Sequence, residues 1–122
     1  QSKSKVVPLW ELVAIKTRGW NKEGNLGLVV GATFPEQLKR LRELCPDLPV
    51  LIPGIGTQGG DLELAVGYGS DKNREKAIIS ISRGIIYASR GKDFAIAARN
   101  SAAQWRDKMN EIAASLSNQQ NE

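Results

Sequence analysis

The sequence contains no histidine and only 1 cysteine, Cys45. Without histidine, the chain cannot supply the imidazole of a Ser–His–Asp triad or a histidine ligand for zinc. A single cysteine excludes a disulfide within the chain and a metal site built from several cysteines. Any chemistry in this chain must therefore use lysine, arginine, carboxylates, hydroxyl groups or backbone amides, and no metal site is predicted.

Long apolar runs are also missing. No run approaches the ~18 residues of a membrane-spanning helix, and the first ten residues, QSKSKVVPLW, lack the apolar stretch of a signal peptide. We therefore expect a cytoplasmic protein that does not insert into membranes. The 17 basic and 13 acidic residues give a net charge of +4, without a block of five like charges. This pattern predicts no nucleic-acid-binding arm, although it suits an anionic ligand.

The 122 residues, 41% of them hydrophobic, are those of a globular chain that buries a core. Apolar spacing and capping residues predict alternating helices and strands. The second helix should begin at the capping box Thr33-Phe34-Pro35-Glu36, and Asp61 should cap the third. The predicted helices are 8–20, 33–46, 62 to 67 or 69, and 93–116, and the predicted strands are 26–32, 49–53 and 77–82. Residues 117–122 are expected to form a frayed tail. Trp10 and Trp20 are expected to pack the first helix. One face of the last helix, with Trp105 and Met109 as core residues, is expected to carry Phe94, Ala97, Ser101, Trp105, Met109, Ile112 and Leu116.

This order, one helix followed by three strand–helix units, predicts a parallel sheet with right-handed crossovers. Because each strand is apolar on both faces, three strands alone would leave edges and surfaces uncovered. The sequence therefore reads as part of a larger α/β fold. A closed (β/α)₈ barrel needs ~250 residues, about twice the length of this chain, whereas a small doubly wound sheet is the alternative.

A glycine-rich loop follows the second predicted strand. Residues 54–59, GIGTQG, match the dinucleotide-binding pattern G-x-G-x-x-G between a strand and a helix. The next strand ends in Ser82-Arg83 rather than in an acidic residue, so only an NADP site with Arg83 on the extra phosphate fits. Pro53 opposes this interpretation, because it stiffens the place where the pattern needs a tight turn. A second alternative is that the glycines merely provide turn geometry.

A companion motif, Ser82-Arg83-Gly84, follows the third predicted strand. Adjacent parallel strands would bring this motif beside the glycine-rich loop. Backbone N–H groups, the Gln58 carboxamide and the Arg83 guanidinium could then converge on one phosphate. The plain alternatives are a surface arginine paired with a carboxylate and a solvated loop amide. No lysine stands at the carboxyl end of a predicted strand, so none is a convincing acid or base, and the segment is predicted to bind rather than to react.

The stretch GLVVGATFPEQLKRLRELCPDLPVLIPGIGTQGGDLE contains the motif PGIGTQGGD (53–61), and the stretch IISISRGIIYASRGKDFAIAARNSAAQWRDKMN contains SRGIIY (82–87). Together they resemble the carboxyl-terminal part of orotidine 5′-phosphate decarboxylases. The likeness runs from about Val7 to Leu116. It implies one partial domain over 1–122, the fifth helix and the last three strand–helix units of a (β/α)₈ TIM barrel, incomplete on its own. The implied reaction converts orotidine 5′-monophosphate to UMP without a cofactor, in a homodimer. A phosphate-binding module without catalysis and an NADP-binding module remain alternatives.

The resemblance also implies roles for particular residues. The groups expected at the phosphate and the pyrimidine are Gln58, Gly59, Gly60, Ser82, Arg83, Gly84 and Tyr87. The lid and the pocket are expected to include Pro53, Gly54, Ile55 and one valine of the Val29-Val30 pair, assigned as Val30. The catalytic Lys-Asp-Lys-Asp array of the family belongs to the second and third strands, which have no counterpart here. We therefore expect no catalytic residue in this chain, and no activity without the amino-terminal half of the barrel as a partner, covalent or separate.

Overall fold

A computed structural model describes residues 6–56 and 60–119 of the chain. The elements, in chain order, are α1 (Leu9–Trp20), β1 (Leu28–Val29), α2 (Pro35–Leu44), β2 (Val50–Pro53), α3 (Leu62–Gly69), β3 (Ala77–Ser80), α4 (Arg83–Ile86) and α5 (Phe94–Gln119). The three strands form one parallel sheet in the order β1-β2-β3. This is the predicted alternation of strands and helices, to which the structure adds the short helix α4.

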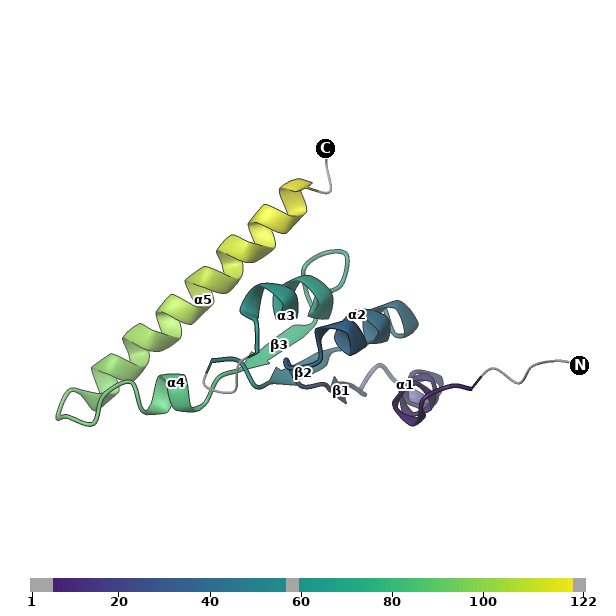
Figure 1. The fold of residues 1–122 in the computed structure, drawn as a ribbon, viewed down its shortest axis with the longest axis horizontal. Helices are drawn as coiled ribbons and strands as arrows, with labels where there is room; N and C mark the ends of the chain where they lie inside the picture. Colours follow the sequence, from purple (N-terminus) through teal and green to yellow (C-terminus); the bar gives the residue numbers. More distant parts are fainter. Residues whose placement is uncertain (1–5, 57–59, 120–122) are drawn as a thin grey trace, which may run out of the picture.

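The sheet has one covered and one open face. Helices α2 and α3 lie over one face, where Val50 and Ile52 of β2 are fully buried (Figure 1). The opposite face carries the row Val29, Leu51 and Ile78, which the strand register aligns. Val29 is 66% and Ile78 55% exposed. The strands are thus apolar on both faces as predicted, but within the described residues only one face is buried.

Two helix starts test the capping predictions. The Asp61 side chain accepts a hydrogen bond from the backbone N–H of Leu64 at 2.9 Å, so α3 begins as predicted. The predicted capping box is wrong, because the N-cap of α2 is Phe34 and makes no side-chain cap bond. A residue before proline is driven out of the helical region, and Phe34 has φ −123° and ψ 65° ahead of Pro35. The cap is thereby displaced from Thr33 by one residue.

The last helix is longer than predicted. It continues past Leu116 to Gln119, and the Ser117 hydroxyl donates a hydrogen bond to the Ala113 carbonyl at 3.0 Å. Residues 120–122 of the predicted tail lie outside the described residues. The middle of α5 packs against the core through Trp105, Met109 and Ile112 as expected, whereas Phe94 is exposed. Across the described ranges, no helix is long and apolar enough to span a membrane.

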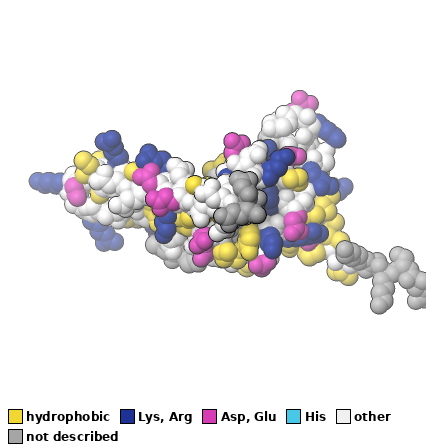
Figure 2. All heavy atoms as spheres, turned by 90° about the horizontal axis from the view of Figure 1, so that it is seen from above, with side chains coloured by type: hydrophobic (Ala, Val, Ile, Leu, Met, Phe, Trp, Pro, Cys, Tyr) yellow, Lys and Arg dark blue, Asp and Glu magenta, His cyan; other side chains and the backbone are white. Residues whose placement is uncertain are grey.

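Helix α1 presents most of its apolar side chains to solvent. Of its residues only Ala14 is buried, while Leu9 is 76% and Trp20 69% exposed. The predicted packing of Trp20 is therefore wrong. Hydrophobic side chains gather on the surface at this end of the molecule (Figure 2), and a groove of about 600 Å³ lies between α1, β1 and α2.

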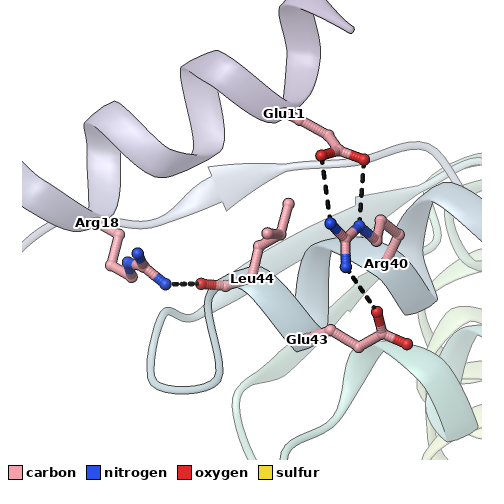
Figure 3. Close-up of polar contacts among 5 residues, drawn as sticks. All are labelled: Glu11, Arg18, Arg40, Glu43 and Leu44. Carbon is pink, nitrogen blue, oxygen red and sulfur yellow. Dashed lines mark hydrogen bonds and ion pairs between the residues drawn. The ribbon is translucent and has the colours of Figure 1, made fainter. Parts of the chain in front are cut away.

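Polar contacts hold α1 against α2 (Figure 3). Arg40 Nε lies 3.1 Å from Glu11 Oε1, and a second nitrogen of the same guanidinium lies 3.0 Å from Glu43 Oε2. Arg18 donates to the Leu44 carbonyl at 2.5 Å. The two carboxylates raise the pKa of Arg40. In the interior, the buried thiol of Cys45 donates to the Ala14 carbonyl at 3.4 Å. These contacts fix α1 although little of its apolar surface is buried.

Candidate functional site

The two loops singled out in the sequence leave the sheet at one edge. Strands β2 and β3 pair in parallel, and their last residues, Pro53 and Ser80, are register partners. The chain enters the glycine loop 54–60 directly after Pro53, and it enters the turn 81–84 directly after Ser80. Ligand sites of parallel α/β folds form at the carboxyl ends of strands. The structure thus brings together two of the predicted site segments.

The glycine loop closes on itself. The N–H of Gly60 donates to the carbonyl of Gly54 at 3.0 Å, and Ile55 and Gly60 form an isolated bridge. Gly54 and Gly56 have φ of +100° and +86°, which disfavour other residues. A Cβ on Gly60 would lie 2.5 Å from the Gly54 carbonyl oxygen and 2.6 Å from Ala32 Cβ. Backbone conformation and close packing therefore require glycine at these positions.

The residues predicted for the lid lie partly in the core. Pro53 is the half-buried end of β2, and Ile55 is only 6% exposed and belongs to the hydrophobic core cluster. Ile55 therefore anchors the start of the loop beneath the surface. Gln58 and Gly59, the residues predicted to contact phosphate and pyrimidine, lie outside the described residues.

The second segment forms the start of α4. The Ser82 carbonyl accepts the N–H groups of Ile85 and Ile86 at 3.1 and 2.8 Å. Arg83 is the exposed first residue of this helix. Tyr87 follows the helix and is exposed, and its N–H donates to the Arg83 carbonyl at 3.1 Å. The guanidinium and the phenol therefore come from one turn, at the edge where the glycine loop begins.

Trp105, which the sequence analysis assigned to the core, lies near one glycine of each loop. A Cβ built on Gly84 would lie 3.6 Å from Trp105 Nε1, and one built on Gly56 would lie 4.0 Å from Trp105 Cζ2. The Ser101 hydroxyl, one helical turn earlier in α5, donates to the Gly84 carbonyl at 2.8 Å. The helical spacing of Ser101 and Trp105 indicated an inward face of α5, but nothing in the sequence indicated which loops that face would meet.

Of the two neighbouring valines, Val29 rather than Val30 lies on the open face of the sheet. Val30 is half-buried and packs against the core on the side of the helices. Since side chains alternate along a strand, only one of the two can face the interior of a closed barrel. The placement thus favours Val29 and speaks against Val30 as a pocket residue.

The described part of the chain holds no cluster of three or more cysteine, aspartate or glutamate side chains that could bind a metal ion. The start of α4 presents the exposed guanidinium of Arg83 at the edge of the sheet where both loops begin. Such a set suits recognition of an anion, and phosphate is bound through these contacts in many α/β proteins.

Comparison with curated proteins finds close relatives. The chain is 53% identical over 104 residues to the orotidine 5′-phosphate decarboxylase of Cupriavidus taiwanensis, covering 84% of this chain and 38% of that protein. It is 54% identical over 102 residues to the enzyme of the same name from Dehalococcoides mccartyi, with the same two coverages. The chain therefore spans 38% of the length of these curated relatives. No protein-family model matches it.

Comparison with solved structures also finds relatives. A putative orotidine-monophosphate decarboxylase from Toxoplasma gondii superposes with a TM-score of 0.76 at 32% identity, over 94% of this chain and 45% of that one. The UMP synthase of Leishmania donovani gives a TM-score of 0.71 at 40% identity, over 86% of this chain and 22% of that one. The predicted fold class, part of a (β/α)₈ barrel, is confirmed. The chain is thus a relative of orotidine 5′-phosphate decarboxylases, matching a stretch equal to 38% of the length of the curated ones.

Proposed function

We propose that this chain supplies the phosphate-binding loops of an orotidine 5′-phosphate decarboxylase, which removes CO₂ from orotidine 5′-monophosphate to give UMP. The observation that carries the proposal is the pairing of Pro53 with Ser80, since it brings the glycine loop and the start of α4 to one edge of the sheet. The names of the relatives support the same activity.

In this proposal Arg83 makes a two-pronged, charge-assisted contact with the substrate phosphate. The backbone at Ser82 and Gly84 and the Tyr87 hydroxyl assist it. The Gly60 N–H is already bonded to the Gly54 carbonyl, so Gly60 acts by closing the loop. Gln58 and Gly59 complete the proposed grip, bridging from the phosphate to the pyrimidine.

The chemical step needs residues from elsewhere in the barrel. We assign the Lys-Asp-Lys-Asp array to the amino-terminal half, joined to this chain or bound to it. That half would pair with the outer strands β1 and β3 and would cover the row Val29, Leu51 and Ile78. The proposal also includes a homodimer of complete barrels in the cytoplasm. The apolar surface on the open face of the sheet supports contact with the amino-terminal half, because uncovered apolar patches mark interaction sites.

The test compares Arg83→Ala with the unchanged enzyme, each prepared as a complete barrel. Loss of one charged phosphate contact in a water-excluded site should cost about 2–4 kcal/mol, which lowers kcat/KM for orotidine 5′-monophosphate roughly 30- to 1,000-fold. Orotidine, which lacks the phosphate, should react equally with both proteins. Arg106→Ala is the matched control, because Arg106 is exposed and pairs with its neighbour Asp107.

Equal losses on both substrates would make Arg83 a structural residue and would contradict the phosphate grip. The NADP-binding alternative is tested by titrating the same protein with NADPH and with UMP. Saturable binding of NADPH without a response to UMP would overturn the proposed function.

A further inference from the structure

The contacts of Trp105 point to a role beyond core packing. Its indole is half-buried and lies beside both candidate loops: a Cβ built on Gly56 would lie 4.0 Å from Cζ2 of the ring, and one built on Gly84 would lie 3.6 Å from Nε1. These two glycines are separated by a strand and a helix in the sequence. Trp105 therefore lies next to two segments that the parallel pairing of β2 and β3 brings to one edge of the sheet.

The backbone at both positions favours glycine. Gly56 has φ +86°, and a Cβ on Gly84 would lie 3.2 Å from Ile81 Cγ2 as well as 3.6 Å from the indole nitrogen. In both loops, therefore, backbone without a side chain lies beside the ring. Because the ring is rigid and flat, we expect a change in its size or position to alter the packing beside both backbones.

A second contact from the same helix acts on the same turn. The Ser101 hydroxyl donates to the Gly84 carbonyl at 2.8 Å, and Ser101 and Trp105 are one turn apart on α5. The two side chains line a small hollow of about 370 Å³ with Gly84, Gln104 and Lys108. Helix α5 therefore holds Gly84, the residue next to Arg83, through the Ser101 hydrogen bond, and the Trp105 ring lies beside the same residue.

We propose that Trp105, assisted by Ser101, is a positioning residue that sets the distance and orientation of the Arg83 turn relative to the glycine loop. This inference rests on the proposed function, because the proposed function assigns the phosphate contacts to these two segments. Trp105 does not touch the substrate in this scheme. It acts by holding Gly56 and Gly84, so its removal should weaken only those steps that use the phosphate.

The test uses the complete barrel and measures kcat/KM for orotidine 5′-monophosphate and for orotidine. Trp105→Leu should lower the value for the phosphorylated substrate about 10- to 100-fold, since small misplacements of binding groups have effects of this size. The value for orotidine should stay within about twofold. Trp105→Phe, which keeps a flat ring, should restore most of the difference. Ser101→Ala removes only a hydroxyl and should show the same selective loss to a smaller degree.

Met109→Ala is the matched control, because Met109 lies one turn further along α5 and packs against the core. It should reduce stability without changing the ratio of the two kcat/KM values. If Trp105→Leu does not fold, Ser101→Ala and Trp105→Phe still decide the question. Equal losses on both substrates, or no loss on either, would overturn the positioning role. An unchanged enzyme that does not convert orotidine 5′-monophosphate at all would instead overturn the proposed function.

Discussion

The guanidinium of Arg42 donates to the backbone carbonyl of Gly69, with Nε at 3.0 Å from the oxygen. The same side chain bonds the carbonyls of Leu48 at 2.8 Å and Cys45 at 3.2 Å. Burial lowers the pKa of Arg42, but arginine stays protonated at any ordinary pH. One cation thereby satisfies the carbonyls at the end of α3 and in the turn after α2, where helix ends otherwise leave them unpaired.

We predict that Arg42→Met lowers the free energy of unfolding by about 2–4 kcal/mol, because several half-buried carbonyls lose their donor. Arg42→Lys should recover less than half of this, since an ammonium cannot reproduce the planar fork. Urea denaturation of the dilute chain measures both. Arg106→Met should change stability by less than about 0.5 kcal/mol. Similar losses for Arg42→Met and Arg106→Met would show that the carbonyl contacts contribute little.

We predict that Gly60→Ala damages the glycine loop. The added Cβ would lie 2.5 Å from the Gly54 carbonyl oxygen and 2.6 Å from Ala32 Cβ, so backbone must shift. The expected loss is about 1–3 kcal/mol of stability, as for other overpacked sites. Gly19→Ala is the control, because a Cβ there meets nothing within 4 Å and α1 should gain about 0.5–1 kcal/mol. Thermal melts of the two variants should therefore shift in opposite directions.

The turn after α3 predicts a pH effect at Asp71. Burial raises the pKa of this carboxyl. The backbone N–H groups of Glu75 and Asn73, each 2.9 Å from Oδ1, and the charges of Lys76 and Arg42 lower it by more. The pKa of Asp71 therefore lies below its ordinary value. A carboxyl with a lowered folded-state pKa stabilises the protein above its unfolded pKa of about 3.9. That stability is lost as the pH falls through the folded-state pKa.

Asp71→Asn should therefore be less stable than the unchanged chain by about 1 kcal/mol at pH 7, since a charged acceptor binds these N–H groups more strongly than an amide. The difference should shrink below about pH 4 and vanish when the carboxyl is protonated. Urea denaturation at pH 7, 5 and 3 measures it. A constant difference across this range would rule out the charge as its source.

The open face of the sheet predicts the behaviour of the chain by itself. Unpaired strand edges and an apolar surface favour self-association, so the isolated chain should sediment above its monomer mass. Ile78→Ser should shift it toward the monomer, because Ile78 lies in the exposed row with Val29 and Leu51. Ile96→Ser, on α5, is the control, since Ile96 is 58% and Ile78 55% exposed. Sedimentation of the isolated chain as a monomer at every concentration tested would contradict this picture.

The sequence predicted the features that local chemistry decides. Asp61 has the side chain that caps a helix, and the cap is present. The apolar run ending at Pro53 is a strand, and its pairing places both loops where their motifs indicated. The position of Thr33 was misjudged because the restriction that Pro35 imposes on Phe34 outweighs the capping side chain.

Other features depend on contacts that local patterns do not contain. The stripe of α1 predicted a helix correctly, but the exposure of Trp20 depends on what surrounds that helix. The alternation of Val29 and Val30 was visible, while the direction of each was decided by the helices over the sheet. The sequence pattern indicated that Trp105 is a core residue. Only the three-dimensional fold places it near Gly56 and Gly84, which lie far apart in the sequence.

The reactivity of the Cys45 thiol reports local unfolding of this structure. It is buried, it donates to the Ala14 carbonyl of α1, and burial raises its pKa. A thiol in this state is shielded from alkylating reagents until α1 separates from the segment after α2. Because the chain has 1 cysteine, the rate of alkylation reports that single local opening. The rate at which α1 detaches can thus be measured without adding a label to the protein.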